Sequence, residues 1–355
     1  MPNTQHPTPN NLDVRIINPI TYPNWDNLLE GTEGNVFSNS VAWAKILSDS
    51  YNYKPVYFSI FEGTRLSALI PVFEVRSAIT GLRGVALPFT DYCTPINHGK
   101  KQFHILFNQI IAYGKKRGWK YFEFRNGAKY LHDETPSLSY FGHILDLTDN
   151  GSQIYSRFRE STKRNVKKAV KQGVNIKLCT SLDAIKDYYK LHCITRKRQG
   201  IPPQPFIFFK RIHDCIISKN GGIVILGTYQ NKILAGAMFF HFGDNVSFKF
   251  GASNKDYQNH RANNLVMWEA IKYYARSGYK SFCFGRTDLE NQGLRHFKSG
   301  WGTTETLIPY YRYDLKKDTF VNKDEKIKPL YNKIFSKMPI PVLRMAGTLL
   351  YRHIG

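Results

Sequence analysis

The feature that most constrains the fold of this chain is an internal repeat. The order hairpin, helix, strand occurs at residues 55–125 and again at 222–286. In both copies the helix ends in glycine and an aromatic-rich strand follows, as GWKYFEFR (118–125) and GYKSFCFG (278–285). Self-similarity at a fixed spacing, here about 170 residues, is typical of duplicated structural units. The sequence therefore predicts two copies of one α/β domain.

The first copy is expected to contain two helices, a β-hairpin and two further strands. Runs of β-branched and aromatic residues predict the hairpin, and apolar residues at helical spacing predict the helices. In chain order these elements are a helix within 36–53 that starts after Ser40, the hairpin of 55–63 and 66–77, the helix 103–118, and the strands 119–127 and 141–147. Residues 84–96, which contain two prolines, are expected to be irregular.

The second copy is preceded by a strongly basic stretch that predicts one helix at 155–174. The expected elements after it are a helix at 181–200, three strands within 222–253, a helix at 263–278 and a strand at 279–288. The predicted fold class is α/β with mixed sheets, in two tandem domains. We expect a flexible lead-in at 1–11, an N-terminal domain at 12–150, a C-terminal domain at 151–315 and a basic tail at 316–355.

The net charge of the chain limits the kinds of partner that it is expected to bind. Fifty Lys and Arg residues against 27 Asp and Glu residues give a formal charge of +23, which favours nucleic acid, nucleotide phosphates or an anionic membrane surface as partners. The sequence has no run of 18 apolar residues and no apolar segment near its start, so a cytoplasmic address is expected. The cysteines form no Cys-x-x-Cys pair, and His-Glu-x-x-His, Gly-x-Ser-x-Gly and Walker motifs are missing, so neither a metal nor a covalent nucleophile is expected.

Six segments, in order along residues 30–315, carry a resemblance to a known family. They are VFSNSVAWAKIL, LPFTDYCTPI, RESTKRNVKKAVKQGV, RKRQGIPPQP, FGASNKDYQNHRANNLVMWEAI and FGRTDLENQGLRHFKSGWG. With these segments the chain resembles the FemABX-like peptidyltransferases of the GNAT superfamily of acyltransferases, including relatives among envelope-polysaccharide proteins. The resemblance implies two tandem GNAT-like domains, with a nucleotide- or lipid-linked cell-wall precursor between them and an aminoacyl-tRNA at the second domain.

The resemblance also assigns roles to particular residues. Lys45 matches a family lysine that contacts the precursor's diphosphate, and Phe297-Lys298 matches a Phe-Lys pair at the reacting centre, where the lysine stabilises negative charge. Two positions depart from the family pattern. Gln204 stands where FemX-type enzymes carry a phosphate-binding Arg, and Asn126, next to Arg125, stands where they carry an Asp. We expect Arg125, Asn126 and Gln204 to contact the substrate.

The acyl donor is expected to bind at the segment before the helix 263–278. In a GNAT fold, splayed strands and a helix N-terminus present backbone N–H groups to the donor's phosphates or carbonyl. The expected donor-binding residues are His260, Arg261, Ala262, Asn263 and Asn264. This segment lacks the glycines of a typical coenzyme A loop, which favours aminoacyl-tRNA over acetyl-CoA. The structural alternative is an ordinary helix capped by an Asn side chain.

Lys298, Phe297 and Asp288 are the expected catalytic residues. An ammonium group at Lys298 would neutralise a tetrahedral oxyanion, a contribution of about 3–4 kcal/mol when well aimed. Asp288 follows a strand end and would accept a proton from the attacking amine, unless it pairs with a neighbouring arginine such as Arg286. Arg286 is expected to bind substrate. A surface lysine in a turn and a carboxylate in an ion pair are the ordinary structural alternatives for these residues.

Two basic segments predict contacts with polyanions. Residues 153–177 contain eight basic residues and one acid, and Arg164 and Lys168 lie on one broad helical face that suits a tRNA backbone or anionic lipid. Residues 339–355 predict a short amphipathic helix with Val342, Ala346, Leu349 and Leu350 on one side. That helix would either dock on the second domain or lie on the inner face of the plasma membrane.

The sequence thus predicts an enzyme without a tightly bound cofactor that transfers an acyl or aminoacyl group directly to a primary amine of an envelope precursor, forming an amide. The expected donor is aminoacyl-tRNA. One alternative is an acetyl-CoA-dependent N-acetyltransferase acting on an amino sugar of a surface polysaccharide. The alternative of another class is a non-catalytic RNA- or membrane-binding module that keeps the duplicated fold.

Overall fold

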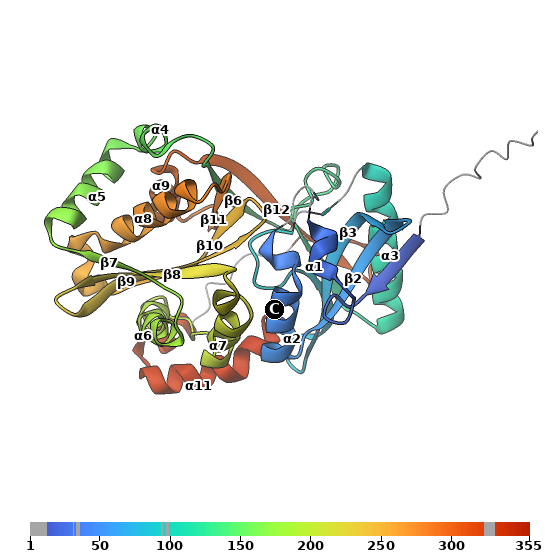
Figure 1. Cartoon of the computed structure of the whole chain (residues 1–355). Helices are drawn as coiled ribbons and strands as arrows, with labels where there is room; N and C mark the ends of the chain where they lie inside the picture. Colours follow the sequence, from blue (N-terminus) through green and yellow to red (C-terminus); the bar gives the residue numbers. More distant parts are fainter. Residues whose placement is uncertain (1–12, 31, 33–35, 94, 97–98, 323–330) are drawn as a thin grey trace, which may run out of the picture.

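A continuous sheet runs through both halves of the chain (Figure 1). The computed structural model describes residues 13–322 and 331–355 apart from 31, 33–35, 94 and 97–98, so the expected lead-in at 1–11 lies outside the described residues. Within them the sheet has 13 strands in the order β1-β2-β3-β4-β5-β12-β6-β11-β10-β9-β8-β7, with β13 paired to β12. Parallel and antiparallel pairs both occur, which confirms the predicted mixed α/β class.

The first half follows the predicted order of elements. The hairpin is β2 and β3, and the helix that ends at Gly118 is α3. Ser40 caps α2, because its hydroxyl accepts a hydrogen bond from the Trp43 amide at 3.3 Å. The elements are β1 (Asp13–Ile17), α1 (Trp25–Leu29), η1 (Phe37–Asn39), α2 (Val41–Tyr51), β2 (Lys54–Glu62), β3 (Arg65–Ser77), β4 (Gly81–Ala86), α3 (Lys100–Arg117), β5 (Tyr121–Arg125) and β6 (Leu138–Asp146).

The second half repeats hairpin, helix and strand as β8 to β11. The tight turns expected between its three antiparallel strands are present, with Gln230, Asn231 and Gly243 at positive φ. The elements are α4 (Gly151–Ser156), α5 (Glu160–Lys171), β7 (Asn175–Cys179), α6 (Leu182–Arg198), α7 (Phe206–Cys215), η2 (Ile217–Lys219), β8 (Gly222–Tyr229), β9 (Lys232–Phe242), β10 (Asn245–Ser253), η3 (Lys255–His260), α8 (Ala262–Arg276), β11 (Ser281–Asp288) and α9 (Gln292–Ser299).

Two strands join the halves by crossing between them. β6, which ends the first half, pairs with β11 of the second half. β12 (Thr304–Asp314), which follows the second half, returns to pair with β5 of the first half on one side and with β6 on the other. β13 (Thr319–Phe320) extends β12. Each half therefore completes its part of the sheet with a strand from the other side of residue 150.

Helices cover both faces of the second-half sheet. In Figure 1, α4, α5, α8 and α9 lie above the strands, and α6, α7 and α11 lie below them. The halves also meet through aromatic packing, since the ring of Trp43 on α2 lies 6.1 Å from that of Phe208 on α7 and Phe37 lies 5.1 Å from Phe240 on β9. Trp43 is fully buried in this contact. The two halves thus share one apolar core at the junction, which fixes the cleft between them.

The predicted basic helix at 155–174 is wrong as a single element. It forms two helices, α4 and α5, separated at residues 157–159. Phe158 is 2% exposed and packs against Trp268 and Trp301, and the Arg159 amide donates to the Gly300 carbonyl at 2.9 Å. Burial of Phe158 therefore interrupts the helix. The basic residues around it gave no indication of this break.

Other differences concern short strands and the tail. Residues 84–86, expected to be irregular, belong to β4, and β1, β7 and β12 were not expected. α10 (Tyr331–Lys337) and α11 (Ile340–Leu350) lie in the tail, with η4 (Tyr351–His353) after them. α11 packs on α6 and buries Leu343 and Gly347, whereas Val342 and Leu349 of the expected apolar side face solvent. Docking of the tail thus uses other residues than that side. None of the helices that the structure describes is both long and apolar enough to cross a membrane.

Candidate active site

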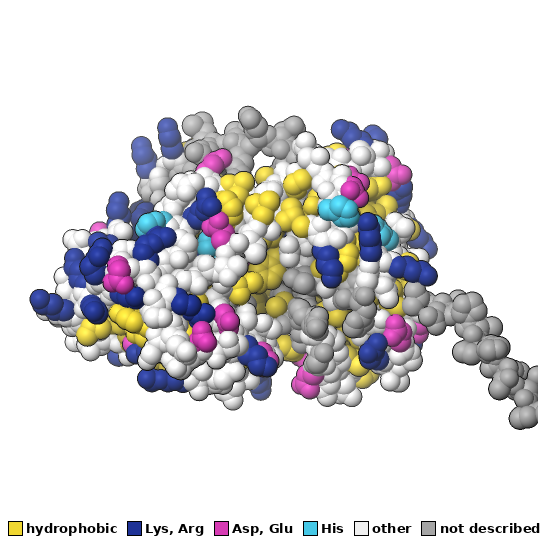
Figure 2. All heavy atoms as spheres, turned by 90° about the horizontal axis from the view of Figure 1, so that it is seen from above, with side chains coloured by type: hydrophobic (Ala, Val, Ile, Leu, Met, Phe, Trp, Pro, Cys, Tyr) yellow, Lys and Arg dark blue, Asp and Glu magenta, His cyan; other side chains and the backbone are white. Residues whose placement is uncertain are grey.

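Two cavities meet at β10 and α9. One is a cleft of about 870 Å³ between the halves, and the other is a pocket of about 280 Å³ at the start of α8. Residues 249–251 of β10 and Leu294 of α9 line the cleft, whereas Ser253 of β10, Asn254 directly after it, and residues 293, 296 and 297 of α9 line the pocket. The same two elements therefore form walls of both cavities. Seen from above, a hollow with apolar side chains lies between the two halves (Figure 2).

Basic side chains dominate the cleft. Its lining contains the six cations Arg83, Arg125, Arg196, Lys249, Arg286 and Arg312, against the two carboxylates Asp91 and Glu123. An excess of positive charge inside a partly buried cleft attracts anions such as phosphates, because the field is screened less there than at an open surface.

Asp91 lies at the centre of this charge cluster. Burial tends to raise the pKa of its carboxyl group, but the nearby cations Lys249, Arg286 and Lys298 outweigh that effect and hold the pKa below its ordinary value. Its side chain is 31% exposed, and a carboxylate oxygen lies 3.9 Å from Nε of Arg286. Asp91 is therefore an ionised carboxylate that faces the cleft, where it could accept a proton from a bound ligand.

Arg286 is held against two tyrosine rings. Its guanidinium carbon lies 4.3 Å from the centre of the Tyr140 ring, and Nη1 donates to the Tyr310 hydroxyl at 2.6 Å. That hydroxyl donates in turn to the Asp91 carbonyl. Burial acts to lower the pKa of Arg286, yet Tyr310, Tyr140 and Asp91 raise it overall, so the guanidinium stays charged. Arg286 therefore lines the cleft as a cation, and its contact with a substrate stays a prediction.

Arg125 serves the shape of the cleft. It is 8% exposed, and Nη1 donates to the carbonyls of Leu87 and Thr90, both at 3.0 Å. Its Nη2 and the Nη2 of Arg312 bind the Glu123 carboxylate at 2.9 and 3.2 Å. Burial would raise the pKa of Glu123, but Arg125 and Arg312 lower it to about 2. Arg125 thus lines the cleft and also fixes the turn that carries Asp91, and its contact with a substrate stays a prediction.

The remaining residues expected at the acceptor lie in different places. Gln204 lines the cleft, buried to 5% exposure, and its Oε1 binds Nε2 of His192 at 2.8 Å. Asn126 ends β5 at positive φ, and its amide donates to the Pro309 carbonyl at 2.8 Å. Lys45 is outside the cleft lining: it is exposed on α2 and lies 3.5 Å from Asp49. Contact of Asn126 and Lys45 with a substrate stays a prediction.

The donor pocket is built around the start of α8. Arg261, at φ 57°, is the N-cap residue, and no side chain caps the helix. The alternative of an Asn-capped helix is therefore wrong. The Asn264 amide donates to the Arg261 carbonyl at 2.9 Å, so the amides before it, those of Ala262 and Asn263, are the ones placed for a ligand. Arg261, Ala262, Asn263 and Asn264 line the pocket, and Nε of Arg261 is buried without a hydrogen-bond partner among the described residues. His260 lies beside the pocket, with its ring 4.8 Å from Tyr229.

The rest of the donor pocket contains hydroxyl, amide and aromatic groups. Phe297 contributes its ring from α9, while Ser161, Thr162 and Asn165 contribute from α5. No Asp or Glu is among the described residues that line it. The pocket therefore suits a ligand with carbonyl, hydroxyl or phosphate oxygens. The structure brings Phe297 and four of the five expected donor residues into this one pocket.

Lys298 is buried, with 3% of its surface exposed, directly beneath the cleft wall. Its Nζ donates to the carbonyls of Gly285 and Arg286 at 2.9 and 2.8 Å. An ammonium group has three donors, so one N–H remains beyond these two bonds. Burial is the main cause that lowers the pKa of Lys298 to about 8, and Asp91 opposes that effect. Lys298 is therefore a buried cation behind the irregular part of β11, where Gly285 has φ 70°.

Asp288 and the basic face of α5 lie at the edges of this site. Asp288 is exposed at the end of β11, and its charge acts to raise the pKa of Lys298. Arg164 and Lys168 are exposed on α5 and line neither the cleft nor the donor pocket. Their roles stay predictions. Among the described residues, no three His, Cys, Asp or Glu side chains are grouped so as to hold a metal ion.

Sequence reasoning missed Asp91, Lys249 and Arg83. Asp91 lies in LPFTDYCTPI, whose paired prolines indicated a loop but not which side chain the loop presents. Lys249 donates from β10 to the Phe89 carbonyl, and burial lowers its pKa. Arg83, 1% exposed, donates to the carbonyls of His353 and Gly355 at 3.0 and 3.1 Å. The alternation of inward- and outward-facing residues along β4 and β10 was the signal that could have identified Arg83 and Lys249. A cation at an inward-facing strand position needs a partner.

This arrangement can support acyl transfer by electrostatics. An anionic acceptor in the cleft would have an ionised carboxylate nearby to receive a proton. A donor in the pocket would meet backbone N–H groups of α8, which are suited to a developing oxyanion. The shared walls at β10 and α9 are where the two ligands would approach each other.

Comparisons with known proteins agree with the fold and with its second half. A family model described as an acetyltransferase (GNAT) domain matches residues 156–299. The lipid II:glycine glycyltransferase of Staphylococcus haemolyticus is 30% identical over 131 residues, which are 35% of this chain and 31% of that protein. The alignment thus spans about a third of that relative's length.

Solved structures extend the likeness to both halves. The crystal structure of FemX matches 86% of this chain and 98% of its own, with a TM-score of 0.68 at 14% identity. A tandem GNAT protein from the clavulanic acid biosynthesis pathway matches the same shares with a TM-score of 0.56 at 7% identity. These matches confirm the duplication expected from the repeat and the tandem GNAT-like fold that the resemblance implied. The chain thus contains a segment, residues 156–299, that matches the GNAT acetyltransferase domain, and it is similar in fold to FemX and in part of its sequence to the lipid II:glycine glycyltransferases.

Proposed function

We propose that this protein is an acyltransferase that moves an aminoacyl group directly onto a primary amine of a cell-envelope precursor. The observation that carries the proposal is the pair of cavities that share β10 and α9 as walls, one rich in cations and the other built on an uncapped helix. The relatives named as lipid II:glycine glycyltransferases support a lipid-linked peptidoglycan precursor as the acceptor. A nucleotide-linked precursor would fit the same cations.

The reaction needs few side chains. The acceptor's amine nitrogen attacks the carbonyl carbon of the aminoacyl ester, a C–N bond forms, and the C–O bond to the donor's ribose breaks. The amine gives up its proton to a carboxylate, Asp91 or Asp288, and the departing ribose hydroxyl takes up a proton. The α8 amides and the charge of Lys298 stabilise the oxyanion in between. No covalent enzyme intermediate is involved.

The proposed donor is aminoacyl-tRNA. Support comes from the sequence at the start of α8, which lacks the glycines of a coenzyme A loop, and from the positive charge around the second half. In this scheme Asn263 and Asn264 would hold the donor's ester and ribose. Acetyl-CoA as donor to an amino sugar is the alternative.

Purified protein supplied with radiolabelled aminoacyl-tRNA and a lipid-linked peptidoglycan precursor is expected to give an acid-stable labelled amide. Parallel reactions with acetyl-CoA, and with amino sugars in place of the precursor, separate the donors and acceptors. Transfer from acetyl-CoA alone would replace the tRNA proposal by the N-acetyltransferase alternative. RNA or membrane binding without transfer from either donor would favour the non-catalytic module.

We also propose that α11 lies on an anionic membrane surface. Val342, Met345 and Leu349 are 41%, 63% and 62% exposed at helical spacing along one face. Arg344 lies on the same helix, and Lys333 and Lys337 lie on α10 just before it. Exposed apolar residues beside cations are typical of interfacial helices. Such contact would hold the cleft near a lipid-linked acceptor on the inner face of the membrane.

Replacing Met345 and Leu349 together by glutamate is expected to weaken binding to vesicles that contain phosphatidylglycerol by at least about tenfold, because it removes apolar contact and adds repulsion. Cosedimentation at 0.1 M salt measures this. Ile16→Glu is the control, since Ile16 is 45% exposed on β1, the strand at the first-half end of the sheet. Equal losses in both variants would refute a specific role for α11.

A further inference from the structure

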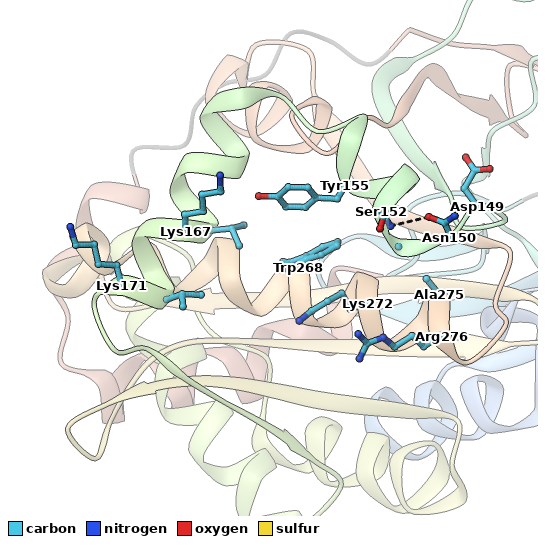
Figure 3. Close-up of a pocket in the computed structure, with 13 residues that line it drawn as sticks. Asp149, Asn150, Ser152, Tyr155, Lys167, Lys171, Trp268, Lys272, Ala275 and Arg276 are labelled. Atoms are coloured by element: carbon cyan, nitrogen blue, oxygen red, sulfur yellow. Dashed lines mark hydrogen bonds between the residues drawn. The ribbon is translucent and has the colours of Figure 1, made fainter.

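A third cavity lies outside the site described so far. It is a groove of about 1060 Å³ between α4, α5 and α8. Figure 3 shows Tyr155 above Trp268 at its centre, Lys167 and Lys171 on α5 toward one end, and Lys272 and Arg276 along α8. We call this cavity the α5–α8 groove. Nothing in the proposed chemistry uses it.

The wall of the α5–α8 groove is aromatic and apolar. The rings of Tyr155 and Trp268 lie 5.1 Å apart, and Phe158 packs edge-on against Trp268 at 5.3 Å, which holds the indole in place. Trp268 keeps part of its surface exposed, whereas the other four tryptophans are at most 3% exposed. Val170, also in the lining, is 60% exposed. The groove thus offers a fixed, accessible ring with apolar surroundings.

The rim of the groove carries four cations, and few acidic side chains neutralise them. Nζ of Lys272 lies 5.5 Å from the Trp268 ring and pairs with Glu269 at 2.7 Å. Lys167, Lys171 and Arg276 form no ion pair with any described residue. Asp149 is the carboxylate in the lining, and it already pairs with Arg157 at 3.3 Å. On the face seen in Figure 2, Lys and Arg side chains outnumber acidic ones at the end that carries α5.

A partly exposed aromatic ring beside unpaired cations has the chemistry that binds single-stranded nucleic acid. Bases stack on the ring, cations pair with the phosphodiester groups, and neither contact needs a particular sequence. A lipid surface fits less well, because the apolar residues lie inside a groove between helices instead of projecting from one face.

We infer that the α5–α8 groove binds a single-stranded segment of RNA, with a base on Trp268 and phosphates at Lys167, Lys171 and Arg276. The inference rests on the proposed function in one respect, which is that the RNA would belong to the acyl donor. α5 and α8 line both the donor pocket and the groove. From Asn263 to Lys272 the helix advances about 14 Å, which is the distance along α8 between the donor pocket and the groove.

Binding of a fluorescein-labelled, twelve-nucleotide single-stranded RNA to the full chain tests the inference by fluorescence anisotropy. The double variant K167Q/K171Q is expected to bind about tenfold more weakly at 0.1 M salt. Its slope of log affinity against log salt is expected to be smaller by about 1.4, since two phosphate contacts are lost. The matched control is K186Q/K190Q, which removes the same charge from two exposed lysines of α6 on the opposite face of the sheet. The control is expected to change the affinity less than twofold.

A second readout needs no substitution. Because Trp268 is the accessible tryptophan, RNA stacked on it should quench the protein's emission and reduce its quenching by acrylamide. Equal losses in both double variants, tighter binding of the duplex form of the same RNA, or unchanged tryptophan emission at saturation would each overturn the inference. So would displacement of the RNA by phosphatidylglycerol vesicles. RNA binding at the groove without acyl transfer would leave this inference standing and contradict the proposed function instead.

Discussion

Replacing Lys298 by methionine is expected to reduce the rate of transfer by a factor of about 10²–10³, with donor and acceptor binding changed less than about threefold. The loss is that of one group aimed at transition-state charge, comparable to removal of an oxyanion-hole donor. Methionine keeps the length of the buried side chain, so β11 keeps its packing. Single-turnover rates at saturating donor and acceptor measure the effect.

The pH profile distinguishes electrostatic catalysis by Lys298 from a structural role. Its pKa is about 8, below the ordinary value, so the ammonium form dominates below pH 8 and is lost above it. The rate in the native protein is therefore expected to fall about tenfold per pH unit above 8, and the Lys298→Met variant should lack this fall. The burial cost of the charged form is present in full below pH 8. Relative to the variant, the native protein should therefore gain stability as pH rises from 8 to 10.5.

An exposed lysine close to Lys298 in the sequence provides the control. Lys280 pairs with Asp244, and its side chain is 65% exposed just before β11. Lys280→Met removes the same charge without touching the cleft and is expected to keep the native rate and pH profile. Full activity in Lys298→Met, with the fold intact by circular dichroism, would remove Lys298 from the mechanism.

Gly285→Ala is expected to destabilise the protein by about 3 kcal/mol and to abolish transfer. Gly285 has φ 70°, where a side chain costs roughly 1–2 kcal/mol. Its added Cβ would also lie 2.5 Å from Oδ2 of Asp91, so the carboxylate would have to leave its place among the cations. Urea unfolding measures the stability, and the transfer assay measures the activity.

Two further variants separate strain from contact. Gly278 has φ 82° and nothing within 4 Å of an added Cβ, so Gly278→Ala reports the backbone cost alone. Adding Asp91→Ala to Gly285→Ala removes the contact and is expected to recover the stability that exceeds this backbone cost. A Gly285→Ala variant that unfolds no more easily than Gly278→Ala, and stays active, would show that Asp91 has no fixed position against β11.

Much of the fold followed from the sequence because the repeated elements are locally encoded. Ser40 and Ser181 cap helices with their side chains, and Gly118 adopts the left-handed conformation that ends α3. The hairpin turn at Gln230-Asn231 depends only on residues next to one another. Such features depend on short-range sterics and hydrogen bonds, which a single sequence contains in full.

The elements that were missed depend on distant partners. β12 contains Pro309 and becomes a strand only between β5 and β6, and β1 and β7 are short strands that each pair with one neighbour at an end of the sheet. Phe158 breaks the basic helix because Trp268 and Trp301 offer it a buried place. None of these partners is near in sequence.

The candidate site shows the same difference between local and long-range features. The donor pocket was largely predicted, because Arg261–Asn264 is one segment and family resemblance located Phe297. The cleft was predicted less well, since Asp91, Lys249 and Arg83 come together only when two halves of the chain meet. Lys45, assigned by resemblance, lies outside its lining. Charge clusters made from several strands leave no local pattern to read.

The crossing of β6 and β12 determines how this protein can be dissected. A fragment that stops at residue 150 would carry β6 away from β11 and would lack β12, leaving β5 and β6 with open hydrogen-bonding edges. Exposed edges of this kind promote aggregation. Neither duplicated unit can therefore be produced as a separate domain by cutting the chain at residue 150.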